Sequence, residues 1–75
     1  MKDIQKIEML LEVAEAINSH KFNLRSSEID INIYRSIGYD NATEIVIHNI
    51  AVIERLLLIL EKKYNRILKQ LNDDN

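Results

Sequence analysis

Two polar side chains in the second half of the sequence have the spacing of metal ligands. Glu44 and His48 are four residues apart, so on a helix they share a face and could bind one ion. Metal-binding helical bundles use Glu-x-x-His pairs from two helices together with further inward carboxylates, and the sequence lacks that set. His48 also shares its line with Arg55 and Lys62. We therefore expect a solvated histidine, with no metal site and no cofactor.

A row of carboxylates near the N-terminus has the residue type needed for acid–base catalysis. Glu8, Glu12 and Glu15 recur at helical spacing. A catalytic carboxylate needs an apolar pocket or a close like charge to shift its pKa, whereas these alternate with apolar residues and are expected to face water. His20 has no recognisable nucleophile and orienting group to serve, and the single glycine excludes a glycine-rich phosphate loop. We expect a protein that is not an enzyme.

A basic group occurs near the C-terminus and could contact phosphate or an acidic partner. Its members are Lys62, Lys63, Arg66 and Lys69. Cations at this end of a helix also complement the helix dipole. The formal net charge of −2 is low for a dedicated nucleic-acid binder. Nucleic acid is therefore a possible but disfavoured partner.

Length and composition limit how these residues can be positioned. The 75 residues make one domain, 1–75, and contain one Gly, no Pro and no Cys. Few turn-forming residues predict a few long elements. A chain this short buries only about 60% of its unfolded surface, and without disulfides its usual remaining support is oligomerisation. We expect no signal peptide and no membrane span, and a cytoplasmic location.

The first third of the chain predicts a helix and then a loop. Ile4, Ile7, Leu11 and Ala14 follow a 3-4-3 spacing, widened by Leu10, Val13 and Ile17, which predicts a helix over 3–18. Residues 19–26 show no sustained period, and we expect a loop there.

Residues 28–37 are ambiguous between strand and helix. Ile29, Ile31 and Ile33 alternate with polar residues as in a strand, but Gly38 stands where a left-handed helix cap would be. Ser27 and Asp30 resemble a capping pair. A lone strand would lack a partner other than 21–25, so we favour a short helix over 28–37.

The C-terminal segment has the most regular pattern. Apolar residues recur at alternating steps of four and three, which predicts a long helix over 41–72 with a heptad seam. The seam consists of Val46, Ile50, Ile53, Leu57, Leu60, Tyr64, Ile67 and Leu71. A second stripe, Ile45, Val52, Leu56 and Ile59, lies on another side and stops there. Asn41 and Glu44 have the spacing of a capping box at the start.

These elements predict an all-α fold: a long-short-long, three-helix, hairpin-like domain. Its first two helices are too short to cover the end of the long helix, so the exposed end should mark an interface. We expect self-association into a bundle, as a dimer in the first instance. The predicted oligomer interface comprises Ile53, Leu57, Leu60, Tyr64, Ile67, Leu68 and Leu71.

One short stretch resembles a known family. The residues IGYDNATEIV (37–46) resemble the L-G-Y-x-N element in the N-terminal domain of phage antirepressor-like Bro proteins. The likeness covers about ten residues, the long helix departs from that family's mixed fold, and no function is carried over from it.

The expected function is non-catalytic: a small regulator, inhibitor or adaptor, of the kind found in phages and mobile elements, that dimerises and binds a protein partner. The alternative is a dimeric helix-turn-helix regulator that binds DNA through residues 29–48. Its second helix would begin with Asn41, Thr43 and Glu44, without Lys or Arg for the phosphates, which disfavours it.

Overall fold

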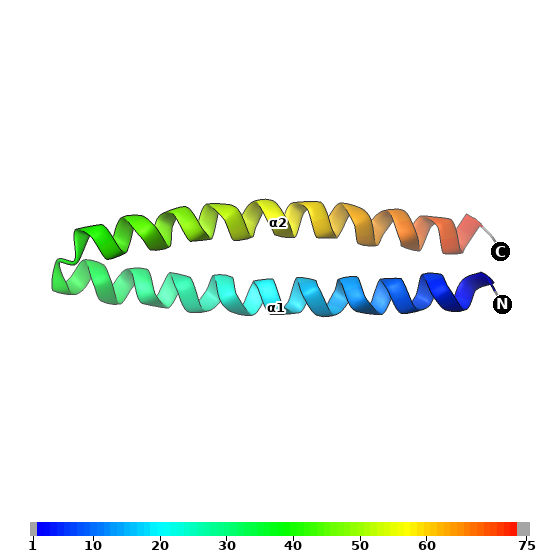
Figure 1. The fold of residues 1–75 in the computed structure, drawn as a ribbon, viewed down its shortest axis with the longest axis horizontal. Coiled ribbons are helices and arrows are strands. Elements are labelled where there is room, and N and C mark those ends of the chain that lie inside the picture. The colour runs from blue at the N-terminus through cyan, green and yellow to red at the C-terminus, as the bar shows by residue number, and fades with distance from the viewer. Residues whose placement is uncertain (1, 74–75) are drawn as a thin grey trace.

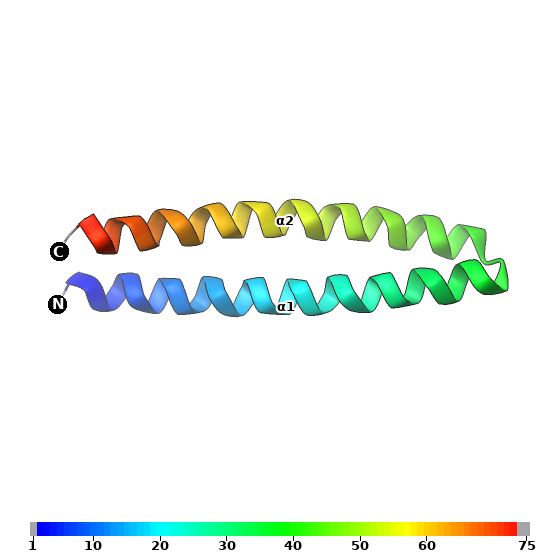
Figure 2. The same ribbon diagram turned by 180° about the vertical axis from the view of Figure 1, so that it is seen from behind.

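The chain folds into one helical hairpin. The computed structural model describes residues 2–73, so residues 1, 74 and 75 of the predicted domain lie outside the described part. Within it, α1 (Lys2–Ile37) and α2 (Asp40–Asp73) lie antiparallel and side by side over their whole length, with both termini at the same end (Figures 1 and 2). The long axis of 56 Å is close to the roughly 54 Å expected for a straight helix of 36 residues.

Where the sequence predicts three helices, residues 2–73 form two, and the expected loop at 19–26 is wrong. Residues 19–26 and 28–37 both belong to α1, which continues without interruption to Ile37. Ser27 and Asp30 therefore lie inside a helix and cap nothing. The segment contains no Pro or Gly, and the weak helix propensity of Ser, His and Asn costs only a few tenths of a kcal/mol per residue. Packing along α2 outweighs that cost.

The two helices meet along a heptad seam. In α1 the side chains that face α2 and are shielded from solvent recur every three or four residues: Leu10, Val13, Ile17, His20, Leu24, Ser27, Ile31 and Tyr34. In α2 they are Thr43, Val46, Ile50, Ile53, Leu57, Leu60, Tyr64, Ile67 and Leu71. The most deeply buried apolar side chains in the described part are Val13 (6% exposed), Leu57 (8%) and Ile67 (5%). No side chain among residues 3–73 is fully buried, as expected where two helices share a single layer of contacts.

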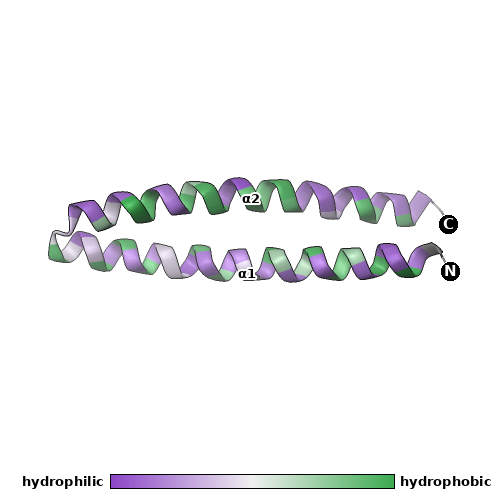
Figure 3. Cartoon of the chain, in the orientation of Figure 1, coloured by the Kyte–Doolittle hydropathy of each residue, from purple (hydrophilic) through white to green (hydrophobic). Residues whose placement is uncertain are grey.

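The core stripe of α1 is not the first one that the sequence suggests. Ile4, Ile7 and Leu11 are 47–61% exposed, and the residues that appeared to widen that stripe, Leu10, Val13 and Ile17, are those that contact α2. Apolar residues lie on several sides of α1, so its inner side is identified only by its partner helix (Figure 3).

Gly38 ends α1 as the sequence predicts. Its φ of +77° is a left-handed conformation that favours glycine. The backbone amide of Tyr39 donates to the carbonyl of Tyr34 (3.0 Å), and that of Gly38 to the carbonyl of Arg35 (3.3 Å). These two bonds form a Schellman motif and satisfy carbonyls at the helix end.

The predicted capping pair at the start of α2 is wrong. The Tyr39 carbonyl accepts the backbone amide of Thr43 (3.0 Å) and also its Oγ1 hydroxyl (2.8 Å), so the helix begins at Asp40. Asn41 thus lies within the first turn, two residues past Tyr39, which occupies the capping position.

The turn fixes which residues lie level with each other. Tyr34 and Thr43 form the first seam pair beside it, and equal 3-4 steps lead away from the turn along both helices. His20 is therefore level with Leu57, and Leu10 with Ile67.

Candidate interaction surfaces

The structure places the predicted oligomer interface inside the hairpin. Leu57 and Ile67 are buried, and Ile53, Leu60, Tyr64 and Leu71 are half-buried in the seam with α1. Only Leu68, at 38% exposure, lies outside the seam. The premise that the chain cannot cover this seam is wrong because α1 has 36 residues, twice the extent that its first apolar stripe indicates.

The hairpin has two broad sides. A residue next to the seam lies on one side if it immediately follows a seam residue in the sequence, and on the other if it immediately precedes one. A shallow hollow over Ile17 and Tyr64 is lined from both helices by residues that immediately follow a seam residue: Ala14, Asn18, Lys21, Glu61 and Asn65. We call this side the hollow face. Because the helices are antiparallel, the same rule holds for both, and residues that immediately precede a seam residue lie on the opposite side.

That opposite side, which we call the stripe face, carries the second apolar stripe of the sequence. Its exposed large apolar residues on α2 are Ile45, Val52, Leu56 and Ile59, between 40% and 62% exposed. Ile33 and Met9 of α1 lie on the same side, and Ile37 extends it at the turn. Between them α1 presents the carboxylates of Glu12 and Asp30 and otherwise small or polar residues: Ala16, Ser19, Asn23 and Ser26.

The chain exposes more surface than a compact protein of its size. Its accessible surface is 6040 Å² for a mass of 8.8 kDa. Folded monomers of that mass expose about 4,800 Å². The excess of roughly 1,200 Å² is larger than the ~800 Å² that each partner contributes to a standard protein–protein interface.

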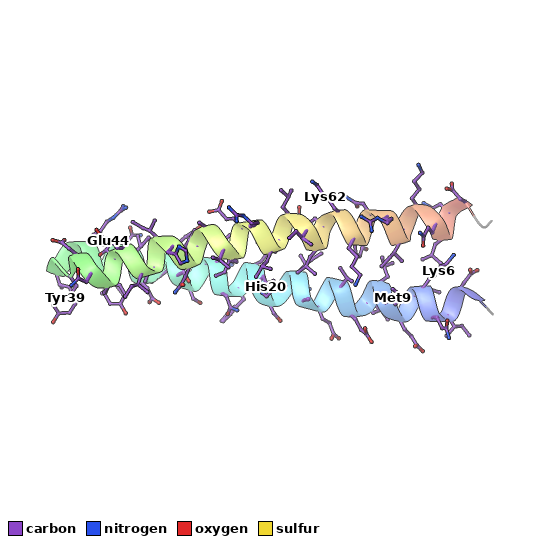
Figure 4. The ribbon with its side chains drawn as sticks, turned by 45° about the horizontal axis from the view of Figure 1, so that its top comes forward. Lys6, Met9, His20, Tyr39, Glu44 and Lys62 are labelled. Carbon is purple, nitrogen blue, oxygen red and sulfur yellow. The ribbon has the colours of Figure 1, made fainter. Side chains whose placement is uncertain are left out.

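The basic group of the sequence lies in solvent along the C-terminal part of α2. Lys62, Lys63, Arg66 and Lys69 are all exposed. Lys62 projects from the side of α2 that faces away from α1 (Figure 4). His48 and Arg55 continue this outer line toward the turn, seven residues apart.

The residues considered for metal binding or catalysis do not converge. Glu44 and His48 are exposed and line a shallow surface depression with Asn41 and Ile45. Among residues 2–73, no group of three or more His, Asp or Glu side chains could hold a metal ion. Glu8, Glu12 and Glu15 are all exposed on α1.

His20 is the functional-site candidate whose position differs most from expectation. Instead of lying in a loop, it is half-buried on the side of α1 that faces α2 (Figure 4). The signal that could have placed it is the 3-4 spacing from Leu10 to Tyr34, which becomes visible only when His20 and Ser27 are accepted as seam residues.

No protein family, curated protein or solved structure matches this chain. The short resemblance to Bro proteins therefore gains no support, and residues 37–46 form the turn and the start of α2. In the described part of the chain, no helix is long and apolar enough to span a membrane.

Proposed function

We propose that the protein is a non-catalytic, self-associating interaction module that binds another protein as a small regulator, inhibitor or adaptor. The observation that carries this proposal is the excess exposed surface of roughly 1,200 Å² relative to a compact monomer. Large exposed apolar areas on small proteins usually mark interaction sites. A hairpin one contact layer thick gains most of its further stabilisation from such contacts.

The hollow face offers a surface for the protein partner at the open end of the hairpin. Ile4, Ile7 and Leu11 of α1 are exposed there, and Leu68 of α2 lies level with them. A helix presenting apolar anchors three and four residues apart is a common way to engage a groove on a partner.

Affinity capture with paired variants tests this function. We expect wild-type protein and Phe22→Glu, which changes an exposed apolar residue elsewhere on α1, to retain the same protein from the source cell. Ile7→Glu/Leu11→Glu should lose it. The purified partner should then co-sediment with the wild type at a fixed ratio. If the double variant retains every protein that the wild type retains, the hollow face has no such role.

A second candidate function is binding to nucleic acid through the outer line of α2. The supporting observation is the row of exposed cations from Arg55 through Lys69. The helix-turn-helix form of this idea finds no support, because residues 29–48 form an antiparallel turn rather than two helices crossing at the 90–120° typical of that motif.

Retention on heparin and bulk DNA distinguishes the two functions. Phosphate binding by the outer line predicts retention that falls steeply with salt and drops in Lys62→Glu/Lys69→Glu. Protein binding alone predicts weak retention that this double variant leaves unchanged.

A further inference from the structure

We propose that a second copy of this chain packs on the stripe face, with the turns of both hairpins at the same end, forming a four-helix bundle. This inference rests on the proposed function, because it assigns part of the excess exposed surface to self-association. It replaces the interface predicted from the sequence, most of which lies in the seam, with the residues of the stripe face, which lie beside the seam.

The stripe face suits a second copy better than the hollow face does. The residues that α2 presents from Ala42 to Ile59 on the stripe face include no charge. The corresponding stretch of the hollow face is interrupted by Glu44 and Glu54, and Lys21 and Arg25 lie across from it on α1. Burying those charges without partners would be costly, whereas over the same stretch the stripe face presents one charge, Asp30 of α1.

The available area also fits a dimer. A standard interface removes about 800 Å² from each partner, and the excess surface of roughly 1,200 Å² can supply this while leaving apolar residues on the hollow face. Two hairpins aligned over their full length make the largest possible contact.

A two-fold axis parallel to the helices fixes the register of this pairing. Such an axis keeps every residue at its own height, so α2 of one copy lies on α1 of the other, antiparallel to it. Leu56 then meets Ser19 of the second copy, and Ile59 meets its Ala16. Large residues against small ones interdigitate, as in well-packed bundles.

The charges on the stripe face are complementary in the same register. Lys63 and Arg66 bracket the height of Glu12. Lys63 and Arg66 of each copy therefore lie beside Glu12 of the other, which gives two such contacts per dimer. All three side chains are exposed in the single chain, so the contact requires no unfolding.

The arrangement with turns at opposite ends is less favourable. It places α2 on α2, and matching the two stripes brings Ile45 against Leu56 and Asn49 against Val52. Because the stripe lies toward the turn, this match leaves the last residues of each α2 uncovered. Glu12 then faces no part of the partner's basic group.

Sedimentation equilibrium of adjacent leucine variants tests the face. We expect a dimeric wild type, with Leu56→Glu weakening dimerisation by about 100-fold because a carboxylate would be buried in the interface. Leu58→Glu is the matched control, since Leu58 lies on the hollow face and should leave dimerisation unchanged. A monomeric wild type, or equal weakening by both substitutions, would overturn the proposal.

A second measurement covers the case in which Leu56→Glu does not fold. The midpoint of thermal unfolding of the wild type should rise with protein concentration, as linkage requires of a dimer. A midpoint that is independent of concentration would contradict self-association.

Disulfide trapping tests the orientation, and the absence of native cysteine makes each probe unique. Mixed Ser26→Cys and Asn49→Cys chains should cross-link, because those two positions face each other only when the turns share an end. Asn49→Cys mixed with Val52→Cys should not, and is the matched control. Efficient linking of the control pair alone would overturn the orientation, since disulfides need Cα atoms within about 7 Å.

Charge reversal gives an independent check of register. Glu12→Lys and Lys63→Glu should each raise the dissociation constant a few-fold, and the combined variant should restore it in low salt. Additive weakening would contradict the pairing. A monomeric protein that still binds its partner refutes self-association and leaves the proposed protein binding intact, whereas an intact dimer without a partner refutes the proposed protein binding alone.

Discussion

The two helices of the hairpin have similar lengths but very different sequence patterns. α2 has an unbroken apolar seam from Val46 to Leu71, whereas the seam of α1 is interrupted by His20 and Ser27. α1 also exposes apolar residues on other sides, including Phe22 at 71%. In proteins, a helix gains most of its stability from tertiary packing rather than from its intrinsic propensity. The difference indicates that packing against α2 stabilises the helical conformation of α1.

Removing a buried side chain from α2 should have the largest effect. We expect Leu57→Ala to lower the free energy of unfolding by about 2–4 kcal/mol, because it opens a cavity in the seam beside His20. Leu58→Ala changes the neighbouring, 54% exposed residue and should cost no more than about 0.5 kcal/mol. Urea unfolding followed by circular dichroism measures both, and similar losses would mean that the seam is misplaced.

The junction between the helices should be the next most sensitive position. Gly38→Ala should cost about 1–2 kcal/mol because its φ of +77° strains any residue with a Cβ. A Cβ at Gly38 would meet no atom within 4 Å, so the loss is backbone strain alone. Gly38→Asn, which tolerates this conformation better, should lose less by the same unfolding measurement. An equal loss would argue against a left-handed cap.

Making α1 resemble α2 should stabilise the hairpin. His20→Leu places an apolar side chain at the half-buried seam position level with Leu57 and should raise the free energy of unfolding by about 1 kcal/mol. His48→Leu is the control, because His48 is exposed on the outer side of α2 and should give no gain. A destabilised His20→Leu protein would show that the imidazole makes a necessary contact.

The start of α2 should respond least. Asn41→Ala should change the free energy of unfolding by less than about 0.5 kcal/mol, because Asn41 does not cap the helix. Loss of a capping side chain would instead cost about 1 kcal/mol. Chemical denaturation with replicate curves separates these values.

The comparison also explains how much the sequence could reveal. The all-helical class, the extent of α2 and the role of Gly38 follow from local sequence patterns, and the structure confirms all three. The continuity of α1 does not, because residues 19–27 include weak helix formers and the polar seam residues among them hide the helical period. Only the length and seam of α2 identify those residues as helical.

The candidate interface shows the same limitation. The strongest apolar seam in the sequence is used within the chain, and the weaker second stripe, from Ile45 to Ile59, is the one left exposed. Sequence periodicity identifies both stripes but does not tell which one is left exposed, since that depends on how much of α2 is covered by α1.

Backbone chemical shifts of residues 19–26 test the central claim most directly. A single continuous α1 predicts helical Cα shifts through this segment and onward to Ile37, without a break at His20 or Ser27. Random-coil shifts across 19–26 would contradict the hairpin, restore a short second helix, and leave the middle of the α2 seam, at Ile53 and Leu57, without its cover.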